Sequence, residues 1–134
     1  MKIFLSYAAS DRQVAGRLAE GLRCEGLEVW AAEKEVLPGD NYGLQIGRAL
    51  ESAEAMAVLV SPESMQSASV QSEINYALGA SNFAGRLIPV IVRPTRSMPW
   101  IMERFPSVKV GGDVGRAAKQ LAGMLRQRFE LQPA

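Results

Sequence analysis

The side chain best placed to do chemistry is the carboxylate of Glu73. An apolar run over residues 55–60, short and β-branched enough to be a buried strand, ends at Ser61-Pro62, and a predicted helix carrying Glu73 follows. At about 100° per residue, Glu73 lies about 60° from Val70, on the margin of the apolar stripe of that helix. It also lies near the carboxyl end of the strand, where open α/β sheets bind ligands. Glu73 is therefore a candidate reactive group, and the competing interpretation is an ordinary solvated helix glutamate.

Serines and small apolar residues surround this glutamate. The apolar stripe has the spacing of an amphipathic helix and consists of Val70, Ile74, Ala77 and Leu78. Serine hydroxyls commonly cap helices or contact solvent, and we expect this of Ser61, Ser64, Ser67 and Ser72. Ser69, four residues before Glu73, is instead expected beside the carboxylate.

The chain contains no histidine and a single cysteine, Cys24. The lack of histidine excludes a Ser-His-Asp or Cys-His catalytic site and any zinc site built on histidine. One cysteine cannot form an internal disulfide and is typical of a reducing cytoplasm, and we expect Cys24 to be unreactive. An enzyme of this composition must work with carboxylates, hydroxyls, Lys, Arg and backbone groups.

The composition is that of one ordinary globular domain. The 134 residues, 48% hydrophobic and 22% charged, are enough for a proper core. The net charge of +1, with Lys and Arg scattered, provides no basic surface for nucleic acid. No apolar run approaches the roughly 18 residues of a membrane span, and no signal-peptide pattern begins the chain. We therefore expect a cytoplasmic protein that binds neither nucleic acid nor membrane.

Strand and helix patterns alternate five times along the chain. The predicted strands cover residues 2–7, 27–30, 55–60, 86–92 and 108–110. This alternation predicts an α/β fold, with a flavodoxin-like five-stranded parallel sheet in the order 2-1-3-4-5 and helices on both faces. Local signals support the boundaries: capping-box spacing from Ser10 to Gln13, a helix-ending Gly26, and Asp113 as a cap. Pro89 removes one donor from the fourth strand.

In this strand order the binding crevice is expected between the loops Ser6–Ser10 and Ser61–Ser69. The glycines Gly39, Gly43 and Gly47 are spaced by four, which matches no dinucleotide or phosphate-binding motif, and we attribute them to a turn and close helix packing. A response-regulator receiver would need acidic residues after the first strand, and a flavodoxin would need a hydroxyl-rich loop there. The sequence supports neither.

Five sequence boxes, in order and at suitable distances, resemble those of Toll/interleukin-1 receptor (TIR) domains of the bacterial type. They are I-F-L-S-Y at 3–7 followed by Ser10-Asp11, G-L-E-V-W at 26–30, L-P-G-D at 37–40, the S-x-x-x-x-x-E-I spacing of Ser67–Ile74, and I-P-V-I at 88–91. The resemblance implies a TIR domain over residues 1–130, followed by a tail at 131–134 that could begin a linker to a sensor domain. Residues 37–40 correspond to the BB loop of the family.

The resemblance also implies an activity, cleavage of the nicotinamide–ribose bond of NAD+ by Glu73. NAD+ is then the substrate, and no cofactor or metal is needed. Around the nucleotide the resemblance places the backbone of Tyr7, Ala8 and Ala9, with hydroxyl donors at Ser6 and Ser10 and the BB-loop residues Leu37 and Asp40 at the border of the pocket. Tyr42, in a loop or first turn, is a candidate stacking ring or equally a staple of the following helix, and Ser69 is expected beside the carboxylate.

Two positions depart from the family pattern. Many catalytic members carry Trp four residues before the glutamate, where this chain has Ser69, and some carry arginines where it has Ala8 and Ala9. An aromatic side chain that would cover the sugar or nicotinamide is therefore missing from that position. Away from this region, we expect Trp30 to belong to the core, and Trp100 and Met102 to pack under the loop before the last strand.

The proposed chemistry suits a chain without histidine. Nicotinamide leaves NAD+ as a neutral molecule, so no general acid is required, whereas ordinary glycosidases need two carboxylates because an alkoxide leaves. One partly desolvated carboxylate can hold the ribose and stabilise the oxocarbenium-like transition state.

Two functions stay open from sequence. One is an NAD+ glycohydrolase or cyclase, the effector of a bacterial antiviral defence protein, activated when TIR domains assemble head to tail into oligomers or filaments. The other is a non-catalytic scaffold that only binds other TIR domains. Glu73 favours the enzyme, and Ser69 in place of Trp favours the scaffold.

Overall fold

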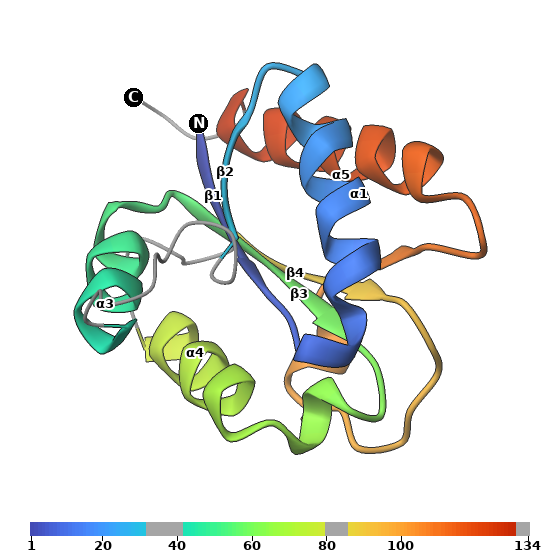
Figure 1. Ribbon diagram of the computed structural model, residues 1–134. Coiled ribbons are helices and arrows are strands. Elements are labelled where there is room, and N and C mark those ends of the chain that lie inside the picture. The colour runs from blue at the N-terminus through green and yellow to red at the C-terminus, as the bar shows by residue number, and fades with distance from the viewer. Residues whose placement is uncertain (32–41, 80–85, 131–134) are drawn as a thin grey trace.

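The structure is a computed structural model that describes residues 1–31, 42–79 and 86–130 (Figure 1). Its strands form one parallel sheet in the order β2-β1-β3-β4-β5, which confirms the flavodoxin-like order predicted from the sequence. The strands are β1 (Lys2–Ser6), β2 (Glu28–Ala31), β3 (Ala55–Val60), β4 (Leu87–Ile91) and β5 (Val108–Lys109).

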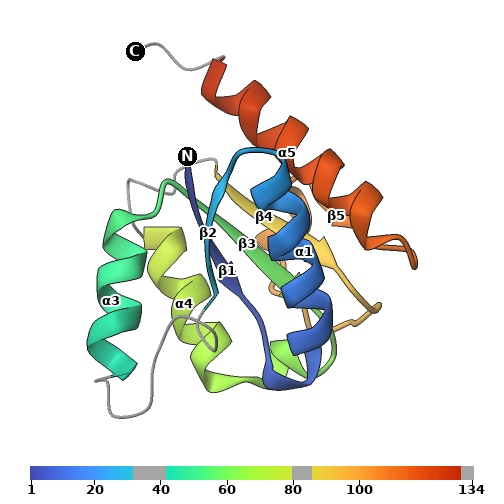
Figure 2. The ribbon, with the colours of Figure 1, turned by 45° about the horizontal axis from the view of Figure 1, so that its top comes forward.

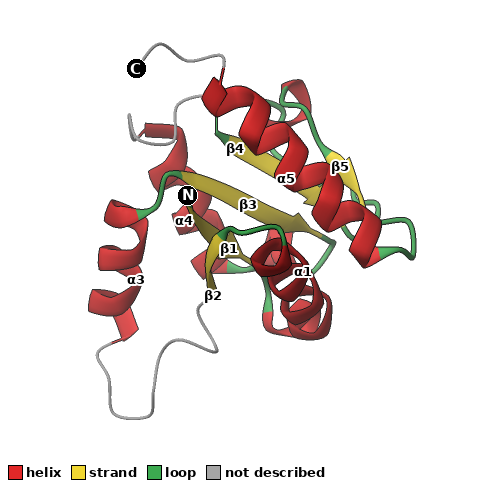
Figure 3. Cartoon of the chain, turned by 90° about the horizontal axis from the view of Figure 1, so that it is seen from above, coloured by secondary structure: helices red, strands yellow, loops and turns green. Residues whose placement is uncertain are grey.

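The helices cover the two faces of the sheet in pairs. Helices α1 (Arg12–Cys24) and α5 (Val114–Glu130) pack on one face, and α3 (Tyr42–Ser52) and α4 (Ala68–Gly79) on the other. Figure 2 shows α3 and α4 side by side on one flank, and Figure 3 shows the strands between the two pairs. Short 3-10 turns occupy Ala9–Asp11, Ser64–Gln66 and Met102–Arg104. Within the described residues, no helix combines the length and apolarity that a membrane crossing requires.

The alternation of side chains along the strands decides what each sheet face presents. In β1, Ile3 and Leu5 belong to the core under α1 and α5, whereas Phe4 belongs to the core under α3 and α4. Since side chains repeat every two residues, Ser6 faces the same side as Phe4, and Ser61, just after β3, faces the side of Leu59. Two polar groups at neighbouring strand ends therefore point to opposite faces.

Pro89 lies inside a central strand without breaking its hydrogen bonds. Val92, just after β4, donates its backbone N–H to the carbonyl of Val60 in β3. Successive N–H groups along a strand alternate in direction, so the nitrogen of Pro89 faces the β5 side. Val108, the first residue of β5, pairs with Val90, so β5 does not extend as far as Pro89. The missing donor of Pro89 therefore has no partner to lose.

The end of α1 follows the expected glycine rule. Gly26 has a φ of 86°, and the N–H groups of Gly26 and Leu27 donate to the carbonyls of Arg23 and Leu22 at 3.0 and 3.1 Å. This is a Schellman cap, which requires the left-handed conformation that glycine adopts freely. Asp113 likewise caps α5 as predicted, its carboxylate accepting from the N–H of Arg116 at 3.0 Å.

Two expectations from the sequence are wrong. The capping box at Ser10–Gln13 does not form, because α1 begins after Asp11, whose carboxylate is used elsewhere and makes no cap. Trp100 does not pack under its loop but is 69% exposed, whereas Met102 is fully buried as expected. Trp100 and Met102 are two residues apart on one helical turn, and side chains with this spacing point in nearly opposite directions.

We expect Gly21→Ala to destabilise the protein, although alanine favours helices. A Cβ at Gly21 would lie 2.6 Å from the Cβ of Ala118 in α5, so the two helices would have to separate. Overpacking of this kind lowers the free energy of unfolding by about 1–3 kcal/mol. Gly123 in α5 is the matched control, since a Cβ there meets nothing within 4 Å. Gly123→Ala should raise the free energy of unfolding by about 0.5–1 kcal/mol. Urea denaturation measures both, and equal effects at the two sites would show that α1 and α5 do not approach this closely.

Candidate active site

The carboxylate of Glu73 is buried and held by a serine from another element. Glu73 is 7% exposed, and the hydroxyl of Ser6 at the end of β1 donates to its Oε1 at 2.7 Å. Ser6 itself is 1% exposed. The contact follows from the pleat of β1, which turns Ser6 toward the face covered by α4.

The orientation of α4 explains why Glu73 is more buried than its marginal position predicts. The buried residues of the helix are Val70, Glu73, Ile74 and Ala77, and Leu78 is 40% exposed. On a helical wheel this buried arc is centred on the Glu73 side of the expected stripe and leaves Leu78 outside. The expectation that Leu78 belongs to the stripe is therefore wrong, and the solvated-glutamate interpretation of Glu73 is wrong as well.

Burial raises the pKa of the Glu73 carboxyl, because the charged form loses its hydration. The hydrogen bond from Ser6 lowers the pKa and offsets part of this effect. Ser6 therefore favours the ionised form while it fixes the orientation of the carboxylate through one of its oxygens.

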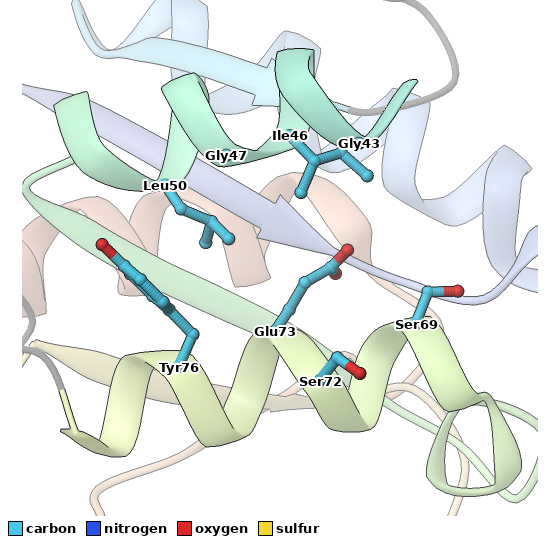
Figure 4. Close-up of a pocket in the computed structure, with 8 residues that line it drawn as sticks. All are labelled: Gly43, Ile46, Gly47, Leu50, Ser69, Ser72, Glu73 and Tyr76. Carbon is cyan, nitrogen blue, oxygen red and sulfur yellow. The ribbon is translucent and has the colours of Figure 1, made fainter. Parts of the chain in front are cut away.

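A pocket of about 430 Å³ opens between α3 and α4 beside this carboxylate (Figure 4). This volume lies within the usual range for small-molecule sites, about 300–1,000 Å³. In Figure 4 the Glu73 side chain rises from α4 toward α3, with Tyr76 on one side of it and Ser69 on the other. The described residues that line the pocket are Gly43, Ile46, Gly47, Leu50, Ser69, Ser72, Glu73 and Tyr76.

The glycines of α3 contribute space to this pocket. Gly43 and Gly47 lie one helical turn apart on the lining, and a Cβ at Gly47 would meet nothing within 4 Å. The expectation that Gly47 serves close helix packing is therefore wrong. Without side chains at these positions, the pocket stays open above the glutamate.

The residues expected around the nucleotide are brought together only in part. Ser6 contacts Glu73 directly, and Ser69 lines the pocket and is exposed. Tyr7 is half-buried against the core under α1 and α5, on the opposite face from Glu73. Ala8 is buried and Ala9 begins the following 3-10 turn, so these two positions offer backbone rather than side chains.

Other predicted residues lie outside the described part of the chain. Leu37 and Asp40 of the BB loop are among them, as is the tail 131–134. Tyr42 begins α3, and its side chain is likewise outside the description. Their assignments stay predictions.

Side chains connect the segments next to the two loops that were expected to border a crevice. Asp11 is 1% exposed. Its carboxylate accepts a hydrogen bond from the Ser61 hydroxyl at 2.5 Å and forms an ion pair with Arg93 at 2.9 Å. Arg93 also reaches Glu63 at 2.7 Å. This polar cluster links the segments that follow β1, β3 and β4 on the side of α1, whereas the pocket lies on the other face of the sheet, between α3 and α4.

The serines of this region have three different roles. Ser61 and Ser64 are fully buried and hydrogen-bond each other, with the N–H of each donating to the other's hydroxyl at 2.9 and 3.1 Å. These reciprocal bonds three residues apart are those of a capping box, so the pair caps the turn after β3 as expected, although it is buried and does not contact solvent. Ser67 does cap α4, accepting from the N–H of Val70 at 3.4 Å, and Ser72 is exposed along the pocket.

Sequence reasoning missed the wall that α3 contributes and the aromatic residue on α4. Ile46 and Leu50, four residues apart on α3, were not among the predicted site residues. Tyr76 lies three residues after Glu73, a spacing that places both on one helix face and could have identified it. Among the described residues no cluster of three or more His, Cys, Asp or Glu side chains could hold a metal ion.

A parallel sheet in this order defines a flavodoxin-like α/β domain, and the ligand-sized pocket beside a buried carboxylate at its carboxyl edge is a candidate site. The sequence profile of the TIR domain matches residues 3–125, and the chain belongs to this family.

Two kinds of relative accompany the family match. Over 73 residues the chain is 34% identical to the 2′ cyclic ADP-D-ribose synthase BtTIR of Bacteroides thetaiotaomicron, a match that covers 54% of this chain and only a quarter (25%) of that protein. The TIR domain of the Toll-related receptor TRR-2 from Hydra magnipapillata superposes with a TM-score of 0.68 at 18% identity, covering 96% of this chain and 94% of that one. A TIR-STING receptor from C. gigas superposes with a TM-score of 0.77 at 20% identity. That match covers 92% of this chain and 38% of the receptor chain. At these identities the two structures establish the fold alone.

We expect Glu73→Gln to leave the protein at least as stable as the wild type at pH 7–8. A carboxyl whose pKa is raised on folding stabilises the folded state fully below the ordinary glutamate pKa of about 4.3, and that stability is lost as the pH rises through the raised value. Glutamine carries no charge, so the variant loses no stability as the pH rises. The melting temperature of the Glu73→Gln protein should therefore exceed the wild-type value by up to a few degrees at neutral pH.

Thermal melts of both proteins between pH 3.5 and 8 measure this difference. The advantage of Glu73→Gln should shrink toward zero as the pH falls below about 4. A variant that melts well below the wild type at neutral pH would show that the ionised carboxylate stabilises the fold, contrary to a pKa raised by burial.

Proposed function

We propose that the protein cleaves the nicotinamide–ribose bond of NAD+, with Glu73 as the catalytic carboxylate. The observation that carries the proposal is the buried Glu73 carboxylate, held through one oxygen by Ser6 and opening into a pocket of ligand size. The pocket is largely apolar at Ile46 and Leu50, which keeps the carboxylate in a medium where its charge acts strongly.

The reaction needs little more than this carboxylate. The bond between C1′ of the ribose and the pyridinium nitrogen breaks with its electron pair going to the nitrogen, so neutral nicotinamide leaves without a proton donor. Positive charge develops on the ribose, and the Glu73 anion stabilises it electrostatically. Water then attacks C1′ to give linear ADP-ribose, or a nucleophile of the same molecule closes a cyclic product.

The Bacteroides relative supports this reaction class through its name, a cyclic ADP-ribose synthase. The match covers about a quarter of that protein, so the product formed by this chain is part of the proposal's test. The remaining contacts proposed for NAD+ are the backbone of Tyr7, Ala8 and Ala9, the BB-loop residues Leu37 and Asp40, and the ring of Tyr42.

We further propose that the domain is an effector of bacterial antiviral defence that is activated by head-to-tail assembly of TIR domains. Among the described lining residues, Glu73 is the one that carries a charge, so none of them offers a cation to the pyrophosphate of NAD+. A second domain docking over the pocket would complete the binding site, and a contact of this heterologous kind propagates into oligomers or filaments.

A scaffold function is the second candidate. The observation that favours it is Ser69, an exposed hydroxyl at the position where many catalytic members carry Trp. A scaffold would assemble with other TIR domains but would release no nicotinamide.

Incubation with NAD+ followed by chromatography of the products decides between the two candidates. We expect the wild type to release nicotinamide and Glu73→Gln to be slower by roughly 100-fold or more, because a preorganised charge in a buried site commonly contributes that much. The melting temperatures of both proteins show that the variant is folded. Equal turnover by the variant would remove Glu73 from the mechanism, and no turnover at any protein concentration would leave the scaffold.

The same assay over a dilution series tests activation by assembly. Turnover per molecule should rise with protein concentration. It should fall when an inactive chain that carries both Glu73→Gln and Asp40→Ala is added in excess. Turnover that stays constant while light scattering shows a monomer would demonstrate that one chain contains the whole site.

A further inference from the structure

Tyr76 gives the pocket an aromatic wall close to the carboxylate. Its side chain lines the pocket beside Leu50 of α3 (Figure 4). Three residues of helix rise about 4.5 Å, so Tyr76 lies that far beyond Glu73 along α4. Ser69 lies four residues in the other direction. The pocket therefore has an aromatic and apolar end and a hydroxyl end, with the carboxylate between them.

The charge of the pocket selects between the parts of a dinucleotide. Glu73 supplies a negative charge, and the other described lining residues are apolar or carry neutral hydroxyls. An anion next to an aromatic face attracts a flat organic cation, which gains from cation–π contact when it is desolvated. The pyridinium of NAD+ is such a cation, whereas the pyrophosphate carries the sign that this pocket repels.

We infer that Tyr76 is a specificity-determining residue that binds the pyridinium ring of the substrate against its aromatic face. The inference rests on the proposed NAD+ cleavage and adds the orientation of the substrate within the pocket. With the ring at the Tyr76 end, the ribose C1′ lies beside Glu73, one helical turn away. The anionic remainder of the dinucleotide then leaves the pocket past Ser69 and Ser72.

This orientation also accounts for the departure at Ser69. The family pattern places an aromatic residue four positions before the glutamate, and this chain has an aromatic residue three positions after it. Both positions border the same pocket. The ring that holds the substrate is supplied from the opposite side of the carboxylate, and the small Ser69 leaves room for the ribose and phosphates.

Binding of two small probes tests the subsite without any turnover. The probes are 1-methylnicotinamide, a pyridinium cation, and neutral nicotinamide, titrated against the full chain by NMR. We expect the wild type to bind the cation at least about threefold more tightly than the neutral ring. Tyr76→Leu should weaken binding of the cation by about 3- to 30-fold, the range of a cation–π contact, and Tyr76→Phe should restore most of the loss.

Leu78→Ala is the matched control for these variants. Leu78 is on the same helix and equally exposed, at 40%, but does not line the described pocket, so its truncation should leave binding and turnover unchanged. In NAD+ kinetics, Tyr76→Leu should raise KM more than it lowers kcat, because the ring contact is present in the ground state.

The outcomes separate this inference from the proposed function. If the wild type cleaves NAD+ but Tyr76→Leu matches it in KM and in affinity for the cation, the subsite is refuted and the function stands. If the wild type does not cleave NAD+ but its binding of 1-methylnicotinamide still depends on Tyr76, the pyridinium subsite is supported and the function is refuted.

Discussion

The site depends on the burial of one carboxylate with one hydroxyl donor. Removing a carboxylate from water is costly unless it is hydrogen-bonded or protonated. Among the described residues, Ser6 supplies the hydrogen bond to Glu73, and the raised pKa shows that it offsets the lost hydration only in part. Both residues are positioned by periodicity, Ser6 by the two-residue repeat of β1 and Glu73 by the wheel of α4. The fold therefore maintains an unfavourable charge at the edge of a pocket, as catalysis by electrostatic stabilisation requires.

A second polar cluster holds the strand ends that carry this geometry. Asp11, Ser61 and Arg93 join the segments after β1, β3 and β4 on the face opposite Glu73. Because Asp11 is buried, its bonds to a hydroxyl and a guanidinium offset the loss of water. With the ends of β1 and β3 fixed to each other, Ser6 and the start of α4 keep a constant separation.

The fold could be predicted from the sequence, and so could the position of Glu73 near the carboxyl edge of the sheet, because both depend on local periodicity. The strand order followed from alternating patterns, and Glu73 followed from its place after a strand. The pocket was not predictable in its position, since it depends on how α3 lies against α4, and Gly47 contributes empty space that no sequence pattern displays. Trp100 was misjudged and the burial of Asp11 was not predicted, because both depend on which distant segments lie nearby.

The most direct test compares the titration of Glu73 with the pH dependence of NAD+ cleavage. In protein labelled with ¹³C at glutamate carboxyls, the resonance absent from Glu73→Gln reports the carboxyl itself. The account predicts that it titrates above the ordinary glutamate range, that kcat/KM rises with pH through the same value, and that Ser6→Ala moves both upward together. A carboxyl that titrates as an exposed glutamate, or a rate indifferent to its ionisation, would contradict the assignment of Glu73 as the catalytic group.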